Sequence, residues 1–234
     1  MKIDNFEHID NWQGIKDSTM NTIGKDTGVY PKSDWKRRLI MSEHSPIRRL
    51  KFYWRWVDIK YWVSVHLVRH KIGMEHFVKT QRTDRTGIDR NELPQGALVN
   101  HACEADAQAL INVSRKRLCF CASPETRQAW EAVKKSVAEV EPELASCMVK
   151  ECVYRGFCPE MFPCGYSDTI QFQKELTEYR KGINKNGDTD EEVYKNQLRD
   201  AIRGLMINHD QIDVSKILLN ELYGVSNIET DQSK

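Results

Sequence analysis

The sequence predicts an α+β (α/β) protein, with a domain over residues 1–165 and a helical extension over residues 166–234. In residues 50–56, large apolar side chains alternate with Lys, Tyr and Arg, which is the period of a half-buried strand. In residues 59–67 the apolar positions have helical spacing. The 234 residues suffice for one sizeable core.

The other expected elements are taken in chain order. Residues 1–40 are polar, and we expect short helices over residues 11–22 and 33–41, the second with Ser33 as its N-cap. Residues 83–95 are charged and rich in turn formers, which indicates a loop.

Ser123 and Pro124 begin another predicted helix, because proline is favoured at a first helical position. The buried stripe of this helix is expected to be Trp130, Val133, Val137 and Val140. After Gly165 we expect a linker over residues 182–190 and two further helices, over residues 191–207 and 214–223.

Bulk properties favour a cytoplasmic enzyme. The formal net charge is +1, whereas general nucleic-acid binders carry a basic surplus, so we expect no nucleic-acid partner. The first residues lack the basic and apolar regions of a signal peptide, and no run of 18 apolar residues occurs. We therefore expect no membrane partner.

Cysteine is the second unusual feature. Seven cysteines without a secretion signal argue against a disulfide framework. Cys152, Cys158 and Cys164 are evenly spaced among glycines and prolines and could converge on a metal. A fourth ligand would be Cys119, Cys121 or Cys147. Zinc ligands usually come in closer pairs and free cysteine is often a buried hydrophobe, so we expect no metal.

Residues 69–82 crowd six cationic or imidazole side chains around one carboxylate. A solvated basic face is one interpretation. However, the cluster follows an apolar helical pattern, so Arg69 and His70 are expected at the end of a packed helix. Phosphate is the usual partner of gathered Arg, Lys and His side chains. The stretch therefore predicts a site for a nucleotide or a phosphate-bearing cofactor.

These residues resemble the signature of flavin-dependent thymidylate synthases, which is Arg-His-Arg, about seven residues, then Ser-x-Arg, after a strand that begins near Ser-Pro. Here Ser45-Pro46 precedes the aromatic strand, and Arg69-His70-Lys71 begins the signature. With one inserted residue, Thr80-Gln81-Arg82 falls on Ser-x-Arg. Without the insertion, Lys79 replaces the serine. We prefer the first alignment, because it keeps a hydroxyl and the arginine.

A second region extends the resemblance, which covers about residues 42–145. Leu93-Pro94 precedes a predicted helix in which Asn112 and Arg117 match the family pattern. Three positions depart from it, by losing a positive charge or replacing a neutral donor. They are Asn100, Asp106 and Gln108.

The resemblance implies a central sheet rich in antiparallel pairs with flanking helices. It also implies a homotetrameric methyltransferase, with active sites shared between subunits, that methylates dUMP using FAD, NADPH and methylenetetrahydrofolate. The implied flavin contacts are Arg69, His70, Lys71 and Asn112. The implied substrate contacts are Glu75, Thr80, Arg82 and Arg117, with Thr80 and Arg117 also catalytic.

Two alternatives stay open. The first is a related flavoenzyme that modifies another pyrimidine nucleotide, because the ligand positions have changed. The second is a catalytically silent oligomer that binds nucleotide through the basic cluster.

Overall fold

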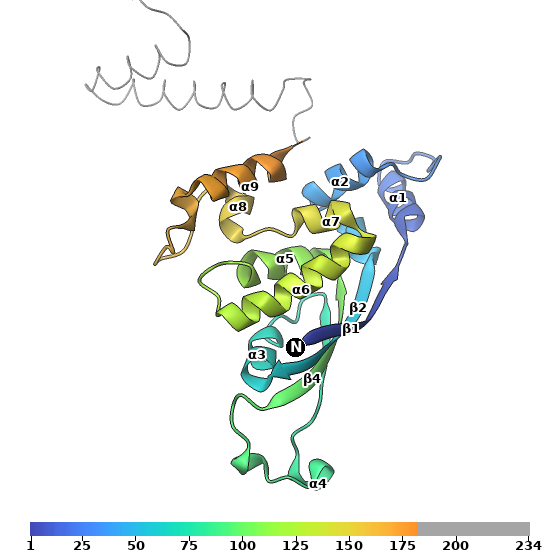
Figure 1. Ribbon diagram of the computed structural model, residues 1–234. Coiled ribbons are helices and arrows are strands. Elements are labelled where there is room, and N and C mark those ends of the chain that lie inside the picture. The colour runs from blue at the N-terminus through green and yellow to red at the C-terminus, as the bar shows by residue number, and fades with distance from the viewer. Residues whose placement is uncertain (182–234) are drawn as a thin grey trace, which may run out of the picture. The chain divides into compact units, whose positions relative to one another are not determined.

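Four antiparallel strands form the sheet at the centre of the fold, in the order β1-β2-β4-β3 (Figure 1). The computed structural model describes residues 1–181. The strands are β1 (Lys2–Ile9), β2 (Lys51–Lys60), β3 (Met74–Val78) and β4 (Leu98–Asp106). The α-helices are α1 (Trp12–Asn21), α2 (Ser33–Met41), α3 (Tyr61–Leu67), α4 (Thr83–Thr86), α5 (Ala107–Arg117), α6 (Pro124–Val140), α7 (Pro142–Cys147), α8 (Glu151–Arg155) and α9 (Ile170–Arg180). Short 3₁₀ helices are η1 (Ser45–Arg49), η2 (Arg90–Glu92) and η3 (Tyr166–Asp168).

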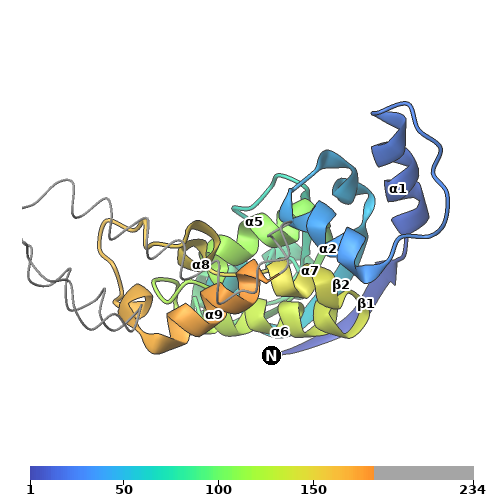
Figure 2. The ribbon, with the colours of Figure 1, turned by 90° about the horizontal axis from the view of Figure 1, so that it is seen from above.

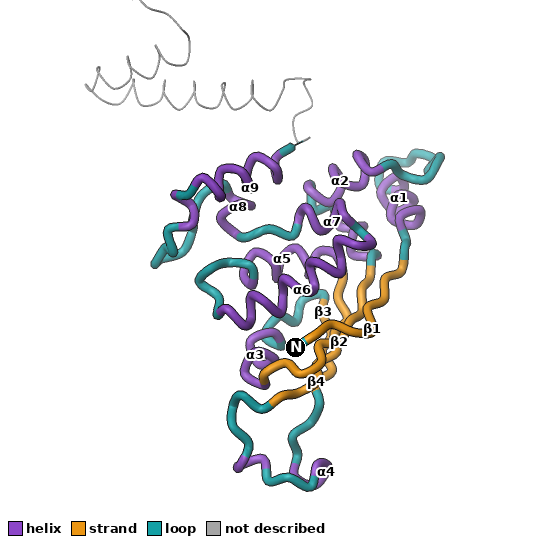
Figure 3. Tube along the Cα trace, viewed as in Figure 1, coloured by secondary structure: helices purple, strands orange, loops and turns teal. Residues whose placement is uncertain are grey.

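One face of the sheet packs against helices, as Figures 1 and 3 show. Phe52, Trp54 and Trp56 are buried on this face, while Tyr53 and Arg55 point to the other face. Helices α3, α5 and α6 contact the strands. The predicted antiparallel sheet flanked by helices is confirmed. The strand predicted over residues 50–56 is also confirmed as β2, which extends to Lys60.

The helix predicted over residues 59–67 begins two residues later than expected, at Tyr61. Ile59 is buried, but it pairs with Val99 inside β2, and α3 starts at Tyr61. The register between β2 and β4 shifts between Trp56 and Ile59, where Asp58 has a φ of 57°. This irregularity lets the strand end directly in the helix.

Strand β1 was missed by the sequence analysis, which expected only helices among the first 40 residues. It is an edge strand whose side chains are mostly exposed or half-buried, so its sequence lacks a clear apolar face. Pairing with β2 holds it, and Arg55 adds a two-pronged ion pair to Asp4 at 2.8 Å. The predicted helices at 11–22 and 33–41 are present as α1 and α2.

Helix α6 packs against strands β1 and β2 (Figure 2), and its Trp130 completes the aromatic core. The Trp130 ring lies 6.0 Å from that of Trp54 and 6.3 Å from that of Trp56. The indole N–H of Trp130 donates to Ser114 at 2.8 Å, which satisfies its buried polar atom. Trp130, Val133 and Val137 are fully buried as predicted, whereas Val140 at the end of the helix is 43% exposed.

The predicted helix start at Ser123-Pro124 is confirmed, whereas the predicted N-cap Ser33 is wrong. Ser123 caps α6, because its hydroxyl accepts from the amide of Thr126. Ser33 does not cap α2. It is the first helical residue, Lys32 is the N-cap, and no side chain caps that end. The predicted loop at 83–95 contains the short helices α4 and η2.

Helix α9 belongs to the same compact unit as the sheet. Its side chains Phe172, Leu176 and Tyr179 are buried within the same hydrophobic cluster as the sheet. Arg37 of α2 donates to the carbonyl of Tyr179 at 2.8 Å. The helices expected at 191–207 and 214–223 lie outside the described residues. Within residues 1–181, no helix has the length and hydropathy of a membrane span.

Candidate functional site

The cationic turn, residues 69–71, lies directly after α3 and faces the start and end of α5. Gly73 makes its tight return possible, because it has a φ of +72° and a side chain there would lie 2.8 Å from the carboxylate of Asp106. The amide of Asp106 in turn donates to the carbonyl of Gly73 at 3.0 Å. The turn and α5 are therefore fixed together.

Asp106, one of the departures from the family pattern, has a structural role as the N-cap of α5. Its carboxylate accepts from the amide of Ala109 at 2.9 Å and so caps α5, and it lies 3.8 Å from the ammonium of Lys51. The side chain is buried beside Gly73. Asp106 thus satisfies the helix start rather than presenting a carboxylate to solvent.

We predict that Asp106→Ala lowers the free energy of unfolding by about 1 kcal/mol, because the amide of Ala109 loses its acceptor. Asp106→Asn keeps an acceptor oxygen and should stay close to wild type. Urea titrations of the three proteins measure the difference. Equal stability of the Ala variant would show that the cap is not stabilising.

Arg117 and His70 are in direct contact, although 47 residues separate them. Arg117 donates from Nε to Nε2 of His70 at 2.8 Å and from its terminal nitrogen to the carbonyl of His66 at 2.8 Å. His70 therefore accepts at Nε2 and carries its proton at Nδ1. Two predicted ligands from different sequence regions are thus brought together.

Both side chains of this contact are partly desolvated. Burial, followed by the charges of Arg117, His76 and Arg69, lowers the pKa of His70 to about 4. Burial and the nearby Arg69 also lower the pKa of Arg117 from its usual range. His70 is accordingly neutral at physiological pH, so the positive charge of the site comes from its arginines and lysine.

A chain of hydrogen bonds, here called the histidine chain, runs beneath the turn. Ser64 Oγ lies 3.1 Å from His101 Nδ1, His101 Nε2 lies 3.0 Å from His76 Nδ1, and His76 Nε2 lies 2.7 Å from the carbonyl of His70. That carbonyl only accepts, so His76 carries a proton at Nε2. With His76 neutral, His101 donates to His76 and Ser64 donates to His101.

His101 is the middle member of the histidine chain. Burial, and then the charge of His76, lowers the pKa of His101 to about 3, so His101 stays neutral. The thiol of Cys103, 3.6 Å from His76 Nδ1, is kept protonated because burial raises its pKa. The chain therefore links Ser64 to His76 through a continuous series of hydrogen bonds.

We predict that His101 makes the fold sensitive to acid. In the unfolded chain a histidine titrates near pH 6.5, but folded His101 titrates near 3, so between these values only the unfolded state is protonated. The free energy of unfolding should fall by up to about 1.4 kcal/mol per pH unit below pH 6.5 from this residue. In His101→Gln, denaturant titrations from pH 7 to 5 should give a shallower slope; an unchanged slope would contradict the assignment.

A pocket of about 390 Å³, here called the loop pocket, lies between α3 and the segment that leaves β3. This volume is in the range of small-ligand sites. Ser64 lines it, so the pocket adjoins the end of the histidine chain. Its other lining residues are Tyr61, Val65, Val68, Val78, Lys79, Thr80, Gln81, Arg82 and Arg90. Three of these side chains are cationic, which favours an anionic ligand.

The predicted substrate residues divide between two places. Thr80 and Arg82 both line the loop pocket, where Arg82 is held by the carboxylate of Asp84 at 2.8 Å. Glu75 lies on the opposite face of the sheet from His76, paired with Glu104 across the strands. Glu75 is therefore not part of the loop pocket.

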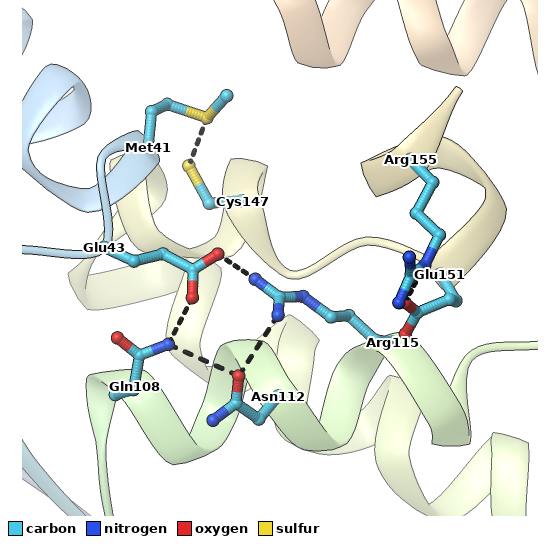
Figure 4. A network of polar contacts seen from close by, with 8 residues as sticks. All are labelled: Met41, Glu43, Gln108, Asn112, Arg115, Cys147, Glu151 and Arg155. Atoms are coloured by element: carbon cyan, nitrogen blue, oxygen red, sulfur yellow. Dashed lines mark hydrogen bonds and ion pairs between the residues drawn. The ribbon is translucent and has the colours of Figure 1, made fainter. Parts of the chain in front are cut away.

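Asn112 lies on a different side of α5 from Arg117, in the polar network shown in Figure 4. Its side-chain oxygen accepts from Gln108 and from Arg115, both at 3.3 Å. Glu43 binds Gln108 at 2.6 Å and also pairs with Arg115. Gln108, another departure from the family pattern, is thus engaged by Glu43, and the side-chain amide nitrogen of Asn112 can donate elsewhere.

Arg69 and Lys71 are exposed on the turn. Arg69 is near enough to act electrostatically on both His70 and Arg117. Asn100, the third departure, accepts weakly from the amide of Asp58 at 3.4 Å. The structure therefore groups Arg69, His70, Lys71 and Arg117 around the turn, and Thr80 with Arg82 in the loop pocket.

Comparison with solved structures identifies the fold. The chain superimposes on flavin-dependent thymidylate synthase ThyX from Helicobacter pylori, crystallised with FAD and dUMP, with a TM-score of 0.51 and 13% identity over 64% of this chain and 100% of that chain. A second structure of that enzyme gives 0.49 at 13% identity, covering 63% and 99%. The UMP/dUMP methylase PolB from Streptomyces cacaoi gives 0.47 at 15%, covering 67% and 96%. No family model and no curated protein sequence matches the chain. The chain thus has the thymidylate synthase ThyX fold.

Sequence reasoning missed the histidine chain. The residue patterns in the sequence assign no functional role to Ser64, His76 or His101. The missing information is the strand register, which places His101 opposite Val78 and Cys103 opposite His76 on the helix-covered face. Alternation along residues 98–106 would have placed His101 inward, and an inward histidine requires a hydrogen-bond partner.

Proposed function

We propose that this protein is a flavin-dependent thymidylate synthase, which methylates dUMP using methylenetetrahydrofolate and NADPH. The contact between Arg117 and His70 supports this most directly, because it joins the two regions of sequence resemblance at one point. The fold, which extends over the whole length of the Helicobacter pylori enzyme, is consistent with it.

The residues of the cationic turn suit FAD, which carries a diphosphate. Arg69 and Lys71 are exposed, and within residues 1–181 no carboxylate pairs with either side chain. His70, held neutral by burial and then by Arg117, has Nδ1–H available to donate. Asn112 can donate from its amide. When bound, FAD would supply the electron-transfer chemistry of the reaction.

The loop pocket suits the nucleotide substrate. Lys79, Arg82 and Arg90 would meet its phosphate, and Thr80 offers a hydroxyl. The ring of Tyr61 provides a flat surface for a base. At the pocket wall, Ser64 can accept a proton and pass its own to His101, which keeps released charge away from solvent. Glu75 would act from elsewhere, which accords with active sites shared in a homotetramer. We place that tetramer in the cytoplasm.

Flavin binding tests the proposal first. Purified protein should be yellow, or become so with added FAD; protein that stays colourless would reject it. With FAD, NADPH and methylenetetrahydrofolate, 5-tritiated dUMP should release tritium. Flavin binding without release would reject thymidylate synthesis.

A related activity on another pyrimidine nucleotide is the second candidate. It is favoured by Gln108, which Glu43 engages, and by Lys71, which cannot form the bidentate contact of an arginine. Tritium release from 5-tritiated UMP but not from dUMP would support this alternative over the first.

A further inference from the structure

Five of the seven cysteines gather where the end of α5 meets the segment after α8. They are Cys119, Cys121, Cys152, Cys158 and Cys164. The other two are placed elsewhere. Cys147 contacts the sulfur of Met41 at 3.3 Å (Figure 4), and Cys103 lies beside His76. The sequence left Cys119, Cys121 and Cys147 open as a fourth metal ligand. Cys147 is not part of this group of five cysteines.

Four of the five thiols surround one small cavity. Cys119, Cys152, Cys158 and Cys164 all line it, together with Lys150, and its volume is about 10 Å³. This is about the space of a single water-sized sphere. Cys121 does not line the cavity; its thiol donates to the carbonyl of Phe162 at 3.9 Å and lies near the thiols of Cys119 and Cys164.

The segment that carries Cys158 and Cys164 has little else to order it. Within the described residues, positions 157–164 make no backbone-to-backbone hydrogen bond. The large apolar side chains of this segment are exposed, at 58% for Phe157, 86% for Met161 and 83% for Phe162. Neither a hydrophobic core nor a hydrogen-bonded ladder therefore explains its path.

Its path nevertheless returns both cysteines to the end of α5. Gly156 and Gly165 frame the segment with φ values of +86° and +79°, which other residues rarely adopt. Lys116 of α5 lies 3.5 Å from the carboxylate of Glu160 in the segment. The backbone thus turns sharply at both ends around the thiols.

We propose that Cys119, Cys152, Cys158 and Cys164 form a tetrahedral thiolate site for Zn²⁺. A set of four sulfur ligands is typical of structural zinc. Within residues 1–181 no three donor side chains stand close enough together to hold an ion, so ion binding requires the four thiol side chains to turn toward the cavity. Each coordinated cysteine loses its S–H proton to solvent and forms one Zn–S bond. Lys150 lines the cavity and also pairs with Glu175 at 2.8 Å, and Lys116 nearby pairs with Glu160 at 3.5 Å.

The metal content of the purified full-length protein tests this site. After growth with added zinc, mass spectrometry of the digested protein should find about one Zn²⁺ per chain. Cys158→Ser and Cys164→Ser should lose more than about nine-tenths of it, because oxygen replaces a thiolate. Cys121→Ser and Cys147→Ser are the matched controls and should keep it. Circular dichroism establishes that each variant is folded.

Cobalt provides a second measurement. Co²⁺ added to metal-free protein should give the visible absorption of a tetrahedral thiolate complex, and Cys158→Ser should abolish it. Metal-free wild-type protein that also fails to bind Co²⁺ would overturn the proposal. Iron with acid-labile sulfide, or zinc retained in both Cys158→Ser and Cys164→Ser, would overturn it as well.

Discussion

Arg69→Ala should leave the protein folded but unable to retain FAD through gel filtration. Arg69 is exposed and no carboxylate of residues 1–181 pairs with it, so its removal should change the free energy of unfolding by less than about 0.5 kcal/mol. A charge-assisted hydrogen bond to phosphate contributes about 1.5–3 kcal/mol, so the flavin Kd should rise by about 10- to 100-fold.

The measurement is the flavin absorbance that co-elutes with the protein, followed by titration with FAD. Arg38→Ala is the matched control, because Arg38 is also an exposed arginine but lies on α2. Unchanged flavin binding in Arg69→Ala would show that the site lies elsewhere. Equal losses in both variants would indicate a general charge effect.

Arg117→Ala should reduce tritium release from dUMP by about 100-fold or more, because the guanidinium both presents charge in the site and fixes His70. Arg117→Lys should not restore the rate. A single ammonium cannot donate in the planar geometry that reaches His70 and the carbonyl of His66 together.

A second readout separates positioning from substrate binding. Arg117 is one cause of the low pKa of His70, so in Arg117→Ala the pKa of His70 should rise from about 4, as followed by NMR. Lys135→Ala on α6 is the control and should change neither measurement. If turnover fell while the pKa of His70 stayed the same, the contact between the two side chains would be disproved.

Local patterns predicted the elements in which one face is buried. Strand β2 and helix α6 each carry a regular apolar stripe, so their spacing sufficed. Strand β1 has no such stripe, because it lies at the sheet edge and its pairing partner supplies its stability. The sequence contains no local signal for that pairing.

The candidate site was predictable only in part for the same reason. The cationic turn is a local cluster and was visible, but the partner of His70 lies 47 residues further along the chain. The link from Ser64 to His101 spans 37 residues and depends on how β4 pairs with its neighbours. Resemblance to a family placed Arg117 near the turn, whereas nothing in the residue pattern placed Ser64 or His101 there.

The packing of Gly73 against Asp106 couples the effects of substitutions at these two positions. An alanine at 73 would meet the carboxylate at 2.8 Å and would also be strained by the φ of +72°. Shortening Asp106 removes the collision but not the backbone strain, so the two substitutions should be non-additive. The stability cost of replacing the glycine therefore depends on which residue stands at position 106.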